Sequence, residues 1–389
     1  MTILHLLVMA SLLAWLYLFF AHGRFWWDGG ESRWLGPGQA LARPPVVTAL
    51  VPARDEEKTI AQVLTGLVNQ EGRFRLRLLV IDDQSTDKTA ATARQALAGA
   101  QARGVEAQVI RGRPLPEGWS GKLWALEQGR RHPLARDADW LWLTDADILH
   151  PPGTLARLLD IATAERRDLV SEMVRLDATV GWARLLIPAF VYFFRLLYPF
   201  SWVKTGRRPA AAGGSILVAR AALEKAGGFN AWRDALIDDC TLARHLAEQG
   251  ARLWLQLSPT SISLRRYAGL VAIWNMVRRT AYTELGLSIL RLIATVIGMT
   301  WLTILPPVLA LAADHVGAAA LGAACWAIMA ITFAPSLSRE GAPGWLAPLL
   351  PLATGLFLVM TIHSALDHHA GRRGGWKGRH YGGLSTETS

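Results

Sequence analysis

The apolar residues of this chain form long uninterrupted runs near its two ends and short runs between them. Four of the long runs carry at most one charged residue: 3–21, 285–313, 316–334 and 345–366. A helix needs roughly 20 apolar residues to cross the hydrocarbon core of a bilayer, and each run is long enough. The pattern therefore predicts a transmembrane anchor over residues 1–22 and a transmembrane region of two or three crossings over residues 285–366.

Between these ends, short apolar runs alternate with longer stretches rich in Ala and Leu. The short runs have the length of strands: 46–51, 76–81, 140–143 and 169–174. The longer stretches between them are typical of helices: 60–69, 90–102, 123–130 and 155–164. This alternation predicts an α/β domain over residues 45–265, in which helices cover a mostly parallel sheet. Ligands of such sheets bind at the carboxyl ends of the strands.

The composition is that of a folded chain. Of 389 residues, 51% are hydrophobic and only 19% are charged, which excludes a disordered chain. Lys and Arg number 41 against 31 Asp and Glu, so the formal net charge is +10. The basic residues are dispersed and no recognition motif accompanies them, so we expect no nucleic-acid binding. The two cysteines, Cys240 and Cys325, are too few and too far apart for a disulfide framework.

The charges beside the first apolar run predict its orientation. No Lys or Arg precedes the run, whereas Arg24 and Arg33 follow it. The positive-inside rule then places the N-terminus outside and the α/β domain in the cytoplasm. A cleaved signal peptide is the competing interpretation, and the absence of basic residues before the run counts against it. We therefore expect an uncleaved anchor.

The basic tail over residues 367–389 conflicts with a simple count of crossings. Its positive charges favour the cytoplasmic side: Arg372, Arg373, Lys377 and Arg379. Three crossings after a cytoplasmic domain would instead put the tail outside. Pro306-Pro307 interrupts the run over 285–313, so we expect this segment to be the re-entrant or interfacial one.

Acidic residues follow two of the predicted strands. Asp82 and Asp83 end the second strand, and Asp145 and Asp147 come just after the third. Two carboxylates one residue apart can share a divalent cation, and oxygen ligands suit Mg²⁺ or Mn²⁺. A lone Asp-x-Asp is more often a solvated turn, but its position after a strand favours the metal. No Gly-rich phosphate loop follows the first strand, which counts against a nicotinamide cofactor or an ATPase.

Three further motifs carry candidate chemistry. Lys122 precedes a predicted helix, where an ammonium group and a helix N-terminus suit an anionic group. Asp238-Asp239 opens an amphipathic run and is either a helix cap or the source of a general base for an acceptor hydroxyl. Gly213 and Gly214 precede another apolar strand, where the missing side chains let a substrate approach the backbone.

Together these motifs resemble the family-2 glycosyltransferases with the GT-A fold, over residues 45–285. The segment from Val51 to Glu57 is similar to the family's opening Pro-x-Arg-Asn-Glu-Glu. The segment from Asp82 to Asp87 is similar to its nucleotide-binding Asp-Asp-x-Ser-x-Asp. The resemblance implies a Rossmann-like mixed sheet, a UDP-linked nucleotide-sugar donor, inversion at the anomeric carbon, and a divalent metal, Mg²⁺ or Mn²⁺.

On this resemblance, each motif takes a role. The residues expected at the donor nucleotide are Pro52, Arg54, Asp55, Glu57, Asp83, Lys122 and Asp145. The metal is expected on Asp145 and Asp147. Asp239 is expected to be the general base, beside Asp238 where the family has Glu.

The last third of the chain adds motifs of lipid-modifying enzymes. Arg278 and Arg279 lie where processive members carry Gln-x-x-Arg-Trp, so Arg278 is expected to help at the diphosphate. Trp376 and Arg379 belong to a tail that resembles the Trp-x-Gly-Arg-x-Tyr of ceramide glucosyltransferases and carotenoid-modifying enzymes. The residues expected on the acceptor side are Gly213, Gly214, Arg279, Trp376 and Arg379.

The whole layout is most similar to the hopanoid-biosynthesis-associated glycosyltransferases of bacteria. This resemblance implies an N-terminal transmembrane helix, a GT-A catalytic domain and a C-terminal transmembrane helix cluster. It also implies a lipid acceptor, with hopanoids among the candidates, and a multi-pass enzyme of the bacterial inner membrane whose catalytic domain is cytoplasmic.

Two segments and one side chain complete the expectations. The aromatic stretch over residues 182–204 is either a buried core helix or an interfacial helix that receives the acceptor lipid, and both interpretations stay open. Residues 266–284 are expected to form an amphipathic interfacial helix. His150 follows the metal motif and is expected at the surface rather than on the metal.

Other functions explain less of the sequence. A processive polysaccharide synthase would need to hold a growing chain, and Arg279 stands where such enzymes have Trp. A sugar nucleotidyltransferase also uses carboxylates and a metal, but no Gly-rich triphosphate loop is present. A membrane transporter or scaffold would account for the apolar ends but not for the clustered acidic motifs between them.

Overall fold

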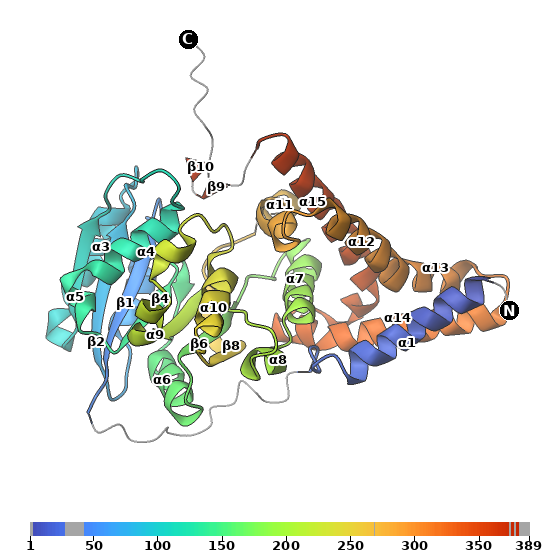
Figure 1. Ribbon diagram of the computed structural model, residues 1–389, viewed down its shortest axis with the longest axis horizontal. Helices are drawn as coiled ribbons and strands as arrows, with labels where there is room; N and C mark the ends of the chain where they lie inside the picture. The colour runs from blue at the N-terminus through green and yellow to red at the C-terminus, as the bar shows by residue number, and fades with distance from the viewer. Residues whose placement is uncertain (1–2, 28–42, 268, 373–374, 377–378, 381–389) are drawn as a thin grey trace, which may run out of the picture. The chain divides into compact units, whose positions relative to one another are not determined.

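A computed structural model describes residues 3–27, 43–267 and 269–372, and the backbone of residues 375–376 and 379–380 (Figure 1). Arg33, Arg373 and Lys377, which carry part of the predicted orientation, lie outside the described residues. The chain divides into two compact units, each described here by itself. The α/β unit contains residues 30–176, 203–265 and 375–389, and the helical unit contains residues 1–29, 177–202 and 266–374.

The α/β unit is built on an eight-stranded sheet in the order β3-β2-β1-β4-β7-β6-β8-β5. Its strands are β1 (Val46–Ala53), β2 (Arg75–Asp82), β3 (Glu106–Arg111), β4 (Trp140–Thr144), β5 (Ile148–Leu149), β6 (Leu169–Arg175), β7 (Ser215–Ala219) and β8 (Leu253–Ser263). The four expected strands are present as β1, β2, β4 and β6. The sheet is mixed, because β7 runs antiparallel to β4 and β6, and β5 runs antiparallel to β8.

Helices cover the sheet of the α/β unit (Figure 1). They are α2 (Ile60–Val68), α3 (Thr89–Leu97), α4 (Gly121–Arg131), α5 (Pro133–Arg136), α6 (Thr154–Ala164), α9 (Arg220–Lys225) and α10 (Asp238–Glu248). All eight residues of β1 are buried, so both faces of the sheet are covered at its centre. The helix expected over 90–102 ends at Leu97, because Gly99 is a weak helix former, and a 3₁₀ turn over Gln101–Arg103 follows.

Trp142 of β4 ties the antiparallel strand β7 to the centre of the sheet. Its side chain is fully buried, and its indole N–H donates to Ser215 Oγ of β7 at 3.1 Å. Thr144 pairs with Ser215 in the register of the two strands. The end of β4 and the start of β7 therefore lie next to each other, and the loops that carry Asp145 and Gly214 leave the sheet at the same edge.

The helical unit consists of long apolar helices and connecting turns. They are α1 (Ile3–Phe20), α7 (Ala183–Leu197), α11 (Leu270–Glu284), α12 (Ile289–Met299), α13 (Leu305–Ala312), α14 (Val316–Arg339) and α15 (Leu350–His369). A short helix, α8 (Phe200–Lys204), lies where the chain passes from this unit to the other. The expected helix over residues 266–284 is present as α11.

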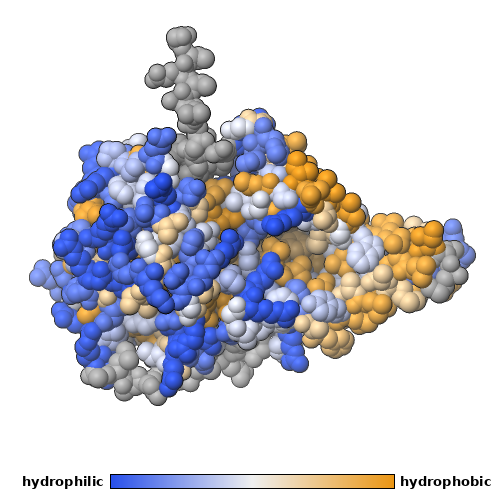
Figure 2. Space-filling model, viewed as in Figure 1, coloured by the Kyte–Doolittle hydropathy of each residue, from blue (hydrophilic) through white to orange (hydrophobic). Residues whose placement is uncertain are grey.

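Four helical segments are long and apolar enough to cross a membrane: Ile3–Phe20, Ile289–Ala312, Val316–Arg339 and Gly344–His369. Their outer faces carry exposed apolar side chains, such as Leu13 of α1 at 63%, Leu290 of α12 at 79% and Leu311 of α13 at 77%. Figure 2 shows these hydrophobic side chains gathered over α1, α12 and α13, whereas the α/β unit presents mainly hydrophilic ones. A soluble protein rarely exposes an apolar surface of this extent.

The proline pair in the second of these segments changes the helix only locally, since the helical stretch continues from Ile289 to Ala312. The re-entrant or interfacial position expected for this segment stays a prediction. The five residues that directly precede α13, Thr300–Ile304, form a π-helical turn. Pro306 follows it in the first turn of α13. Proline has no N–H for the carbonyl of the fourth residue before it, which is Leu302. Trp15 of α1 fills this place, because its indole N–H donates to Leu302 O at 2.8 Å. The side chain of Trp15 is only 1% exposed.

The aromatic stretch over 182–204 forms α7 and α8. Tyr192 of α7 is buried, and its hydroxyl lies 3.0 Å from Thr332 Oγ1 of α14. Phe193 stacks edge-on against Phe357 of α15 at 5.4 Å between ring centroids. The core interpretation therefore describes the buried face of α7. The interfacial role stays a prediction. Trp182, just before the helix, has a side chain that is 42% exposed and is therefore the aromatic residue to test for that role.

Candidate active site

The predicted chemical residues of the α/β unit meet at one edge of the sheet, beyond the carboxyl ends of β1, β2 and β4. Six of them line a single pocket: Pro52, Lys122, Asp145, Gly213, Asp238 and Asp239. Thr144, which the sequence did not single out, lines the same pocket. The named residues come from five separate stretches of the sequence, as expected for a ligand site in an α/β sheet.

Lys122 connects the two acidic motifs of the pocket. Ser120 caps α4 by accepting from Leu123 N at 3.4 Å, and this places Lys122 in the first turn of the helix. The Lys122 ammonium lies 2.8 Å from Asp145 Oδ1 and 3.0 Å from Asp238 Oδ2. Burial lowers the pKa of Lys122, but the two carboxylates outweigh it, so the pKa is raised above its usual value. Lys122 is therefore a fixed positive charge between both motifs.

Asp145 and Asp147 lie in the turn between β4 and β5. Burial, with Asp145 and Glu56 nearby, raises the pKa of Asp147 to about 6. The turn is held by the residue after β8, since Leu264 N donates to Asp147 O at 2.7 Å, and by the N-cap residue of α2, since Thr59 Oγ1 donates to Ala146 O at 3.1 Å.

The carboxylates of Asp145 and Asp147 fit a metal ion that takes its remaining ligands from water and substrate. Among the described residues, no group of three or more His, Cys, Asp or Glu side chains comes together to enclose a metal ion. The chain would supply Asp145 and Asp147, and the remaining positions would be left for water and substrate phosphates. Mg²⁺ and related ions are bound in this way, by one or two carboxylates together with phosphate oxygens.

Asp239 stands in the first turn of α10 with both carboxylate oxygens oriented by the backbone. Its Oδ2 accepts from Gly213 N at 2.6 Å, and its Oδ1 accepts from Cys240 N at 2.8 Å. Burial, together with the neighbouring Asp238, raises the pKa of Asp239 to about 7, although Lys122 acts in the opposite direction. A carboxylate with such a pKa is suited to accept a proton near neutral pH.

The two glycines before β7 are needed for different contacts. A Cβ atom at Gly213 would lie 3.1 Å from Asp239 Oδ2 and 3.4 Å from Lys122 Nζ. A Cβ atom at Gly214 would lie 3.0 Å from Val174 Cγ2 of β6. The missing side chain at Gly213 thus lets Asp239 approach the backbone, and the approach of a substrate at this motif stays a prediction.

The predicted nucleotide residues at the ends of β1 and β2 bind two loops to each other. Asp55 has a positive φ of 50°, and its Oδ1 accepts from Thr86 N at 2.7 Å. Glu57 Oε2 accepts from Lys88 N at 3.1 Å, and Arg54 Nη1 donates to Asp83 O at 2.6 Å. Asp83 is fully buried. These bonds join the loop after β1, which follows the pocket residue Pro52, to the loop after β2.

Four predicted residues belong to other elements of the chain. Arg278 and Arg279 belong to α11 in the helical unit, where Arg278 Nε lies 3.1 Å from Asp367 Oδ2 of α15. Trp376 and Arg379 pair with each other in the short antiparallel strands β9 (Gly375–Trp376) and β10 (Arg379–His380). Their side chains lie outside the described residues.

The expectation for His150 is wrong. The imidazole is fully buried, with Nε2 2.7 Å from Thr144 Oγ1 and Nδ1 3.0 Å from Ser261 Oγ. The reason is the short strand β5, which pairs Ile148 with Ser263 of β8 and draws the following residue into the interior. A strand of two residues leaves no periodic pattern in the sequence. The burial of His150 is therefore evident only from the pairing of β5 with β8.

The sheet and its acidic edge define a GT-A-like α/β domain, the class of enzymes that transfer sugars from nucleotides. A family model described as "Glycosyltransferase like family 2" matches residues 44–289. The chain belongs to this family, and it is a glycosyltransferase. No curated protein sequence matches the chain.

Three solved structures are similar to this chain to different extents. The mannosyltransferase PcManGT from Pyrobaculum calidifontis, solved with GDP-Man and Mn²⁺, is 20% identical with a TM-score of 0.56, and the alignment covers 94% of this chain and 100% of that one. TarS of S. aureus, solved with UDP-GlcNAc, is 14% identical with a TM-score of 0.40 over 84% of this chain and 92% of that one. Glucosyl-3-phosphoglycerate synthase of M. tuberculosis is 21% identical with a TM-score of 0.39 over 62% and 80%. The first likeness shows the fold.

Proposed function

We propose that this chain is a membrane-bound inverting glycosyltransferase that moves a sugar from a UDP-sugar to the hydroxyl of a lipid. The observation that carries the proposal is the arrangement of Asp145, Lys122, Asp238 and Asp239 in one pocket of a family-2 domain. The same chain carries four helices apolar enough to cross a membrane, which favours an acceptor that is itself dissolved in lipid.

The donor side of the pocket supplies positive charge where the reaction builds negative charge. A divalent metal, Mg²⁺ or Mn²⁺, held by Asp145 and Asp147, would neutralise the diphosphate as it leaves. The solved structure of PcManGT in complex with Mn²⁺ supports a metal of this kind. Lys122 stands against Asp145 and is placed to bind a phosphate oxygen. Asp83 and Asp55 are proposed to hold the nucleotide from the neighbouring loops.

The acceptor side supplies the base. The acceptor oxygen forms a bond to the anomeric carbon, the bond from that carbon to the diphosphate breaks, and UDP leaves with the electron pair. The hydroxyl proton passes to Asp239, whose orientation is fixed by Gly213 and whose raised pKa makes it a competent base. Asp238 holds Lys122 and thereby couples the two sides of the pocket.

The acceptor is proposed to be a lipid of the bacterial inner membrane, with hopanoids as the first class to test. The resemblance of the chain layout to hopanoid-associated enzymes supports this choice, and α7 with Trp182 is the proposed entry for the lipid. The α/β domain is proposed to face the cytoplasm. Reporter fusions at Asp314, Arg339 and the C-terminus test the topology, because two and three crossings place the last reporter on opposite sides.

The direct test is incubation of the purified enzyme with UDP-sugars and GDP-mannose in the presence of a bacterial lipid extract, followed by mass spectrometry. We expect a lipid whose mass increases by one sugar, and release of UDP. Release of pyrophosphate would indicate a nucleotidyltransferase, and addition of many sugars to one acceptor would indicate a processive synthase. No glycosylated lipid with any donor would contradict the proposal.

A further inference from the structure

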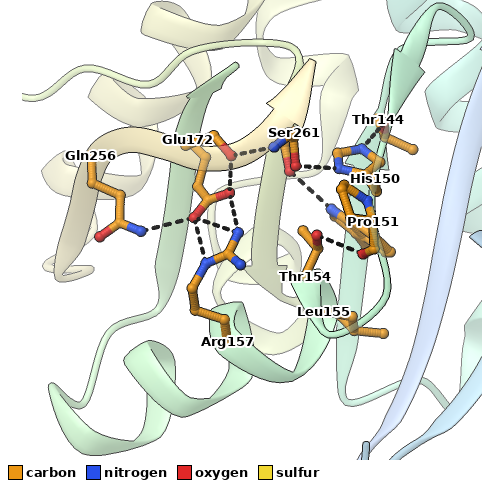
Figure 3. A network of polar contacts seen from close by, with 12 residues as sticks. Thr144, His150, Pro151, Thr154, Leu155, Arg157, Glu172, Gln256 and Ser261 are labelled. Carbon is orange, nitrogen blue, oxygen red and sulfur yellow. Dashed lines mark hydrogen bonds and ion pairs between the residues drawn. The ribbon is translucent and has the colours of Figure 1, made fainter. Parts of the chain in front are cut away.

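A buried polar network runs through the α/β unit to the back of the pocket (Figure 3). It begins at Arg157 of α6 and Glu172 of β6, continues through Ser258 and Ser261 of β8, and ends at His150 and Thr144. Glu172, Ser261 and His150 are fully buried, and Thr144 is 1% exposed. Since a buried polar group is costly unless bonded, a network of this length fixes the positions of its members.

Glu172 is the fixed point of the network. Its carboxylate accepts from Arg157 Nε at 3.2 Å and from Arg157 Nη2 at 2.9 Å. Gln256 Nε2 donates to the same carboxylate at 2.8 Å and Ser258 Oγ at 2.9 Å. Ser258 Oγ in turn accepts from Ser261 N at 3.0 Å. The saturated carboxylate therefore determines where the Ser261 hydroxyl lies.

The direction of the hydrogen bonds follows from the acceptors at the far end. Burial, with a smaller effect of Arg157, lowers the pKa of His150 to about 3, so the imidazole is neutral and has one donor and one acceptor nitrogen. Thr144 Oγ1 lies 3.3 Å from Gly214 O and 3.4 Å from Asp145 O, and it can only donate to these two carbonyls, which share its one hydrogen. Thr144 must therefore accept from His150 Nε2–H, and His150 Nδ1 must accept from the Ser261 hydroxyl.

We infer that Thr144 and His150 are positioning residues of the active site, which set the distance between the turn of Asp145 and the segment of Gly213 and Gly214. Thr144 directly precedes Asp145, and its hydroxyl bonds the carbonyl of Gly214, the residue just before the neighbouring strand β7. Gly213 N then holds Asp239. The hydroxyl of Thr144 is thus the link between the proposed metal carboxylates and the proposed base. The catalytic part of this inference rests on the proposed function.

The test replaces hydroxyls at two buried strand positions. Thr144→Val removes the link and keeps the shape of the side chain. Thr48→Val is the matched control, because Thr48 is also fully buried on a central strand and its hydroxyl makes one bond, to Leu134 O at 2.8 Å. Amide hydrogen exchange of the full-length protein in detergent is compared over residues 145–148 and 213–215. The sugar-transfer rate of the same preparations is then measured.

We expect faster exchange over both segments in Thr144→Val but not in Thr48→Val. We also expect kcat to fall about 10- to 100-fold in Thr144→Val, since a displacement of catalytic groups by about 1 Å has effects of this size. Thr144→Ser keeps the hydroxyl and is expected to restore kcat. Unchanged exchange in Thr144→Val relative to Thr48→Val, or a kcat equal in both, would overturn the inference. If the wild-type protein transfers no sugar, the proposed function fails, while the exchange comparison still decides this inference.

His150 is tested by a pair of substitutions. His150→Gln retains an N–H for Thr144 Oγ1, whereas His150→Leu retains only bulk. We expect the kcat of His150→Gln to exceed that of His150→Leu at least about tenfold with similar midpoints of thermal unfolding. Equal rates for the two variants would show that the imidazole only fills space. If both His150 variants fail to fold, Ser261→Ala is the replacement test, because it leaves His150 and Thr144 in place. An unchanged kcat in Ser261→Ala would contradict the proposed chain of hydrogen bonds.

Discussion

The α/β unit and the helical unit satisfy their buried polar groups in different ways. In the α/β unit, side chains far apart in sequence bond to each other, as Gln256 does with Glu172 and Lys122 with Asp238. In the helical unit, several buried or half-buried threonines bond carbonyls of their own helix, as Thr354 does with Leu350 O at 3.0 Å and Thr361 with Phe357 O at 2.7 Å, beside contacts between helices such as that of Tyr192.

This difference has a physical consequence. A hydroxyl bonded within its own helix keeps its partner however the helix moves, so it places few demands on neighbouring elements. A network between strands and helices requires every element to be in register, and loss of one member leaves others buried and unsatisfied. Single substitutions should therefore be far more damaging in the α/β unit than in the helical unit.

The largest effect is expected for the base itself. Asp239→Asn keeps the shape but cannot take a proton, so turnover should fall about 10²- to 10⁴-fold while UDP binding, measured by calorimetry, remains. Asp234→Asn, an exposed residue of the preceding loop, is the matched control and should keep its activity. Near-normal transfer by Asp239→Asn would mean that another group takes the proton.

The next largest effect is expected for the buried ion pair. Arg157→Met leaves Glu172 as a buried charge without its guanidinium, and the free energy of unfolding should fall by about 3–5 kcal/mol. Arg43 pairs with Asp139 with 66% of its side chain exposed, so Arg43→Met should cost at most about 1 kcal/mol. Denaturation in urea measures the free energy of unfolding of both variants. Equal losses in the two variants would contradict the contrast between the buried and the exposed ion pair.

A smaller effect should follow from pH. The base works only when ionised, and the pKa of Asp239 is raised to about 7 by burial and by Asp238, with Lys122 opposing. Activity should therefore fall as pH drops below 7, approaching tenfold per pH unit, and level off above about 8. The profile of kcat/KM against pH checks this. A rate that stays flat down to pH 5 would exclude Asp239 as the titrating base.

In the helical unit, a single substitution can test the hydrogen bond from Trp15 to Leu302 O, which joins two elements far apart in sequence. Trp15→Phe removes the indole N–H and should lower the free energy of unfolding in detergent by about 0.6–1 kcal/mol. Trp345→Phe is the control, since this side chain is 72% exposed. If both substitutions have the same effect, the carbonyl of Leu302 does not depend on Trp15.

The smallest effect is expected for a hydroxyl bonded within its helix. Thr361→Val should change the unfolding free energy by less than about 0.5 kcal/mol, since the carbonyl of Phe357 keeps its helical partner. A thermal melt compared with that of Thr144→Val sharpens the contrast between the units. A loss as large as that of Thr144→Val would remove the distinction drawn here.

The sequence predicted the elements of the α/β unit better than their connections. The strands β1, β2, β4 and β6 fall within two residues of their apolar runs, because a buried strand has to be apolar along its length. The antiparallel direction of β7 depends on its neighbours in the sheet and leaves no local signal.

The candidate site divides in the same way. Asp145 and Asp239 stand out because carboxylates at strand and helix ends are recognisable along the chain. The salt bridges from Lys122 to Asp145 and Asp238 join residues far apart in sequence, so only the fold reveals them. His150 was misplaced because its burial depends on β5, a strand of two residues. Near Pro306 the structure has a π-helical turn in a continuous helix rather than the expected break, because Trp15, far away in sequence, binds the carbonyl that proline leaves without a donor.

The bond between Trp15 and Leu302 also bears on how the protein is made. Its two partners are 287 residues apart, so Trp15 leaves the ribosome long before its acceptor exists. At typical rates of synthesis the interval is about 15–60 seconds. If α1 crosses the membrane, as proposed, it persists there without this bond during that time, and its 18 residues without Asp, Glu, Lys or Arg suit this requirement. The contact between α1 and Leu302 is therefore a late event, and a chain that stops before residue 302 would contain α1 but could not form this bond.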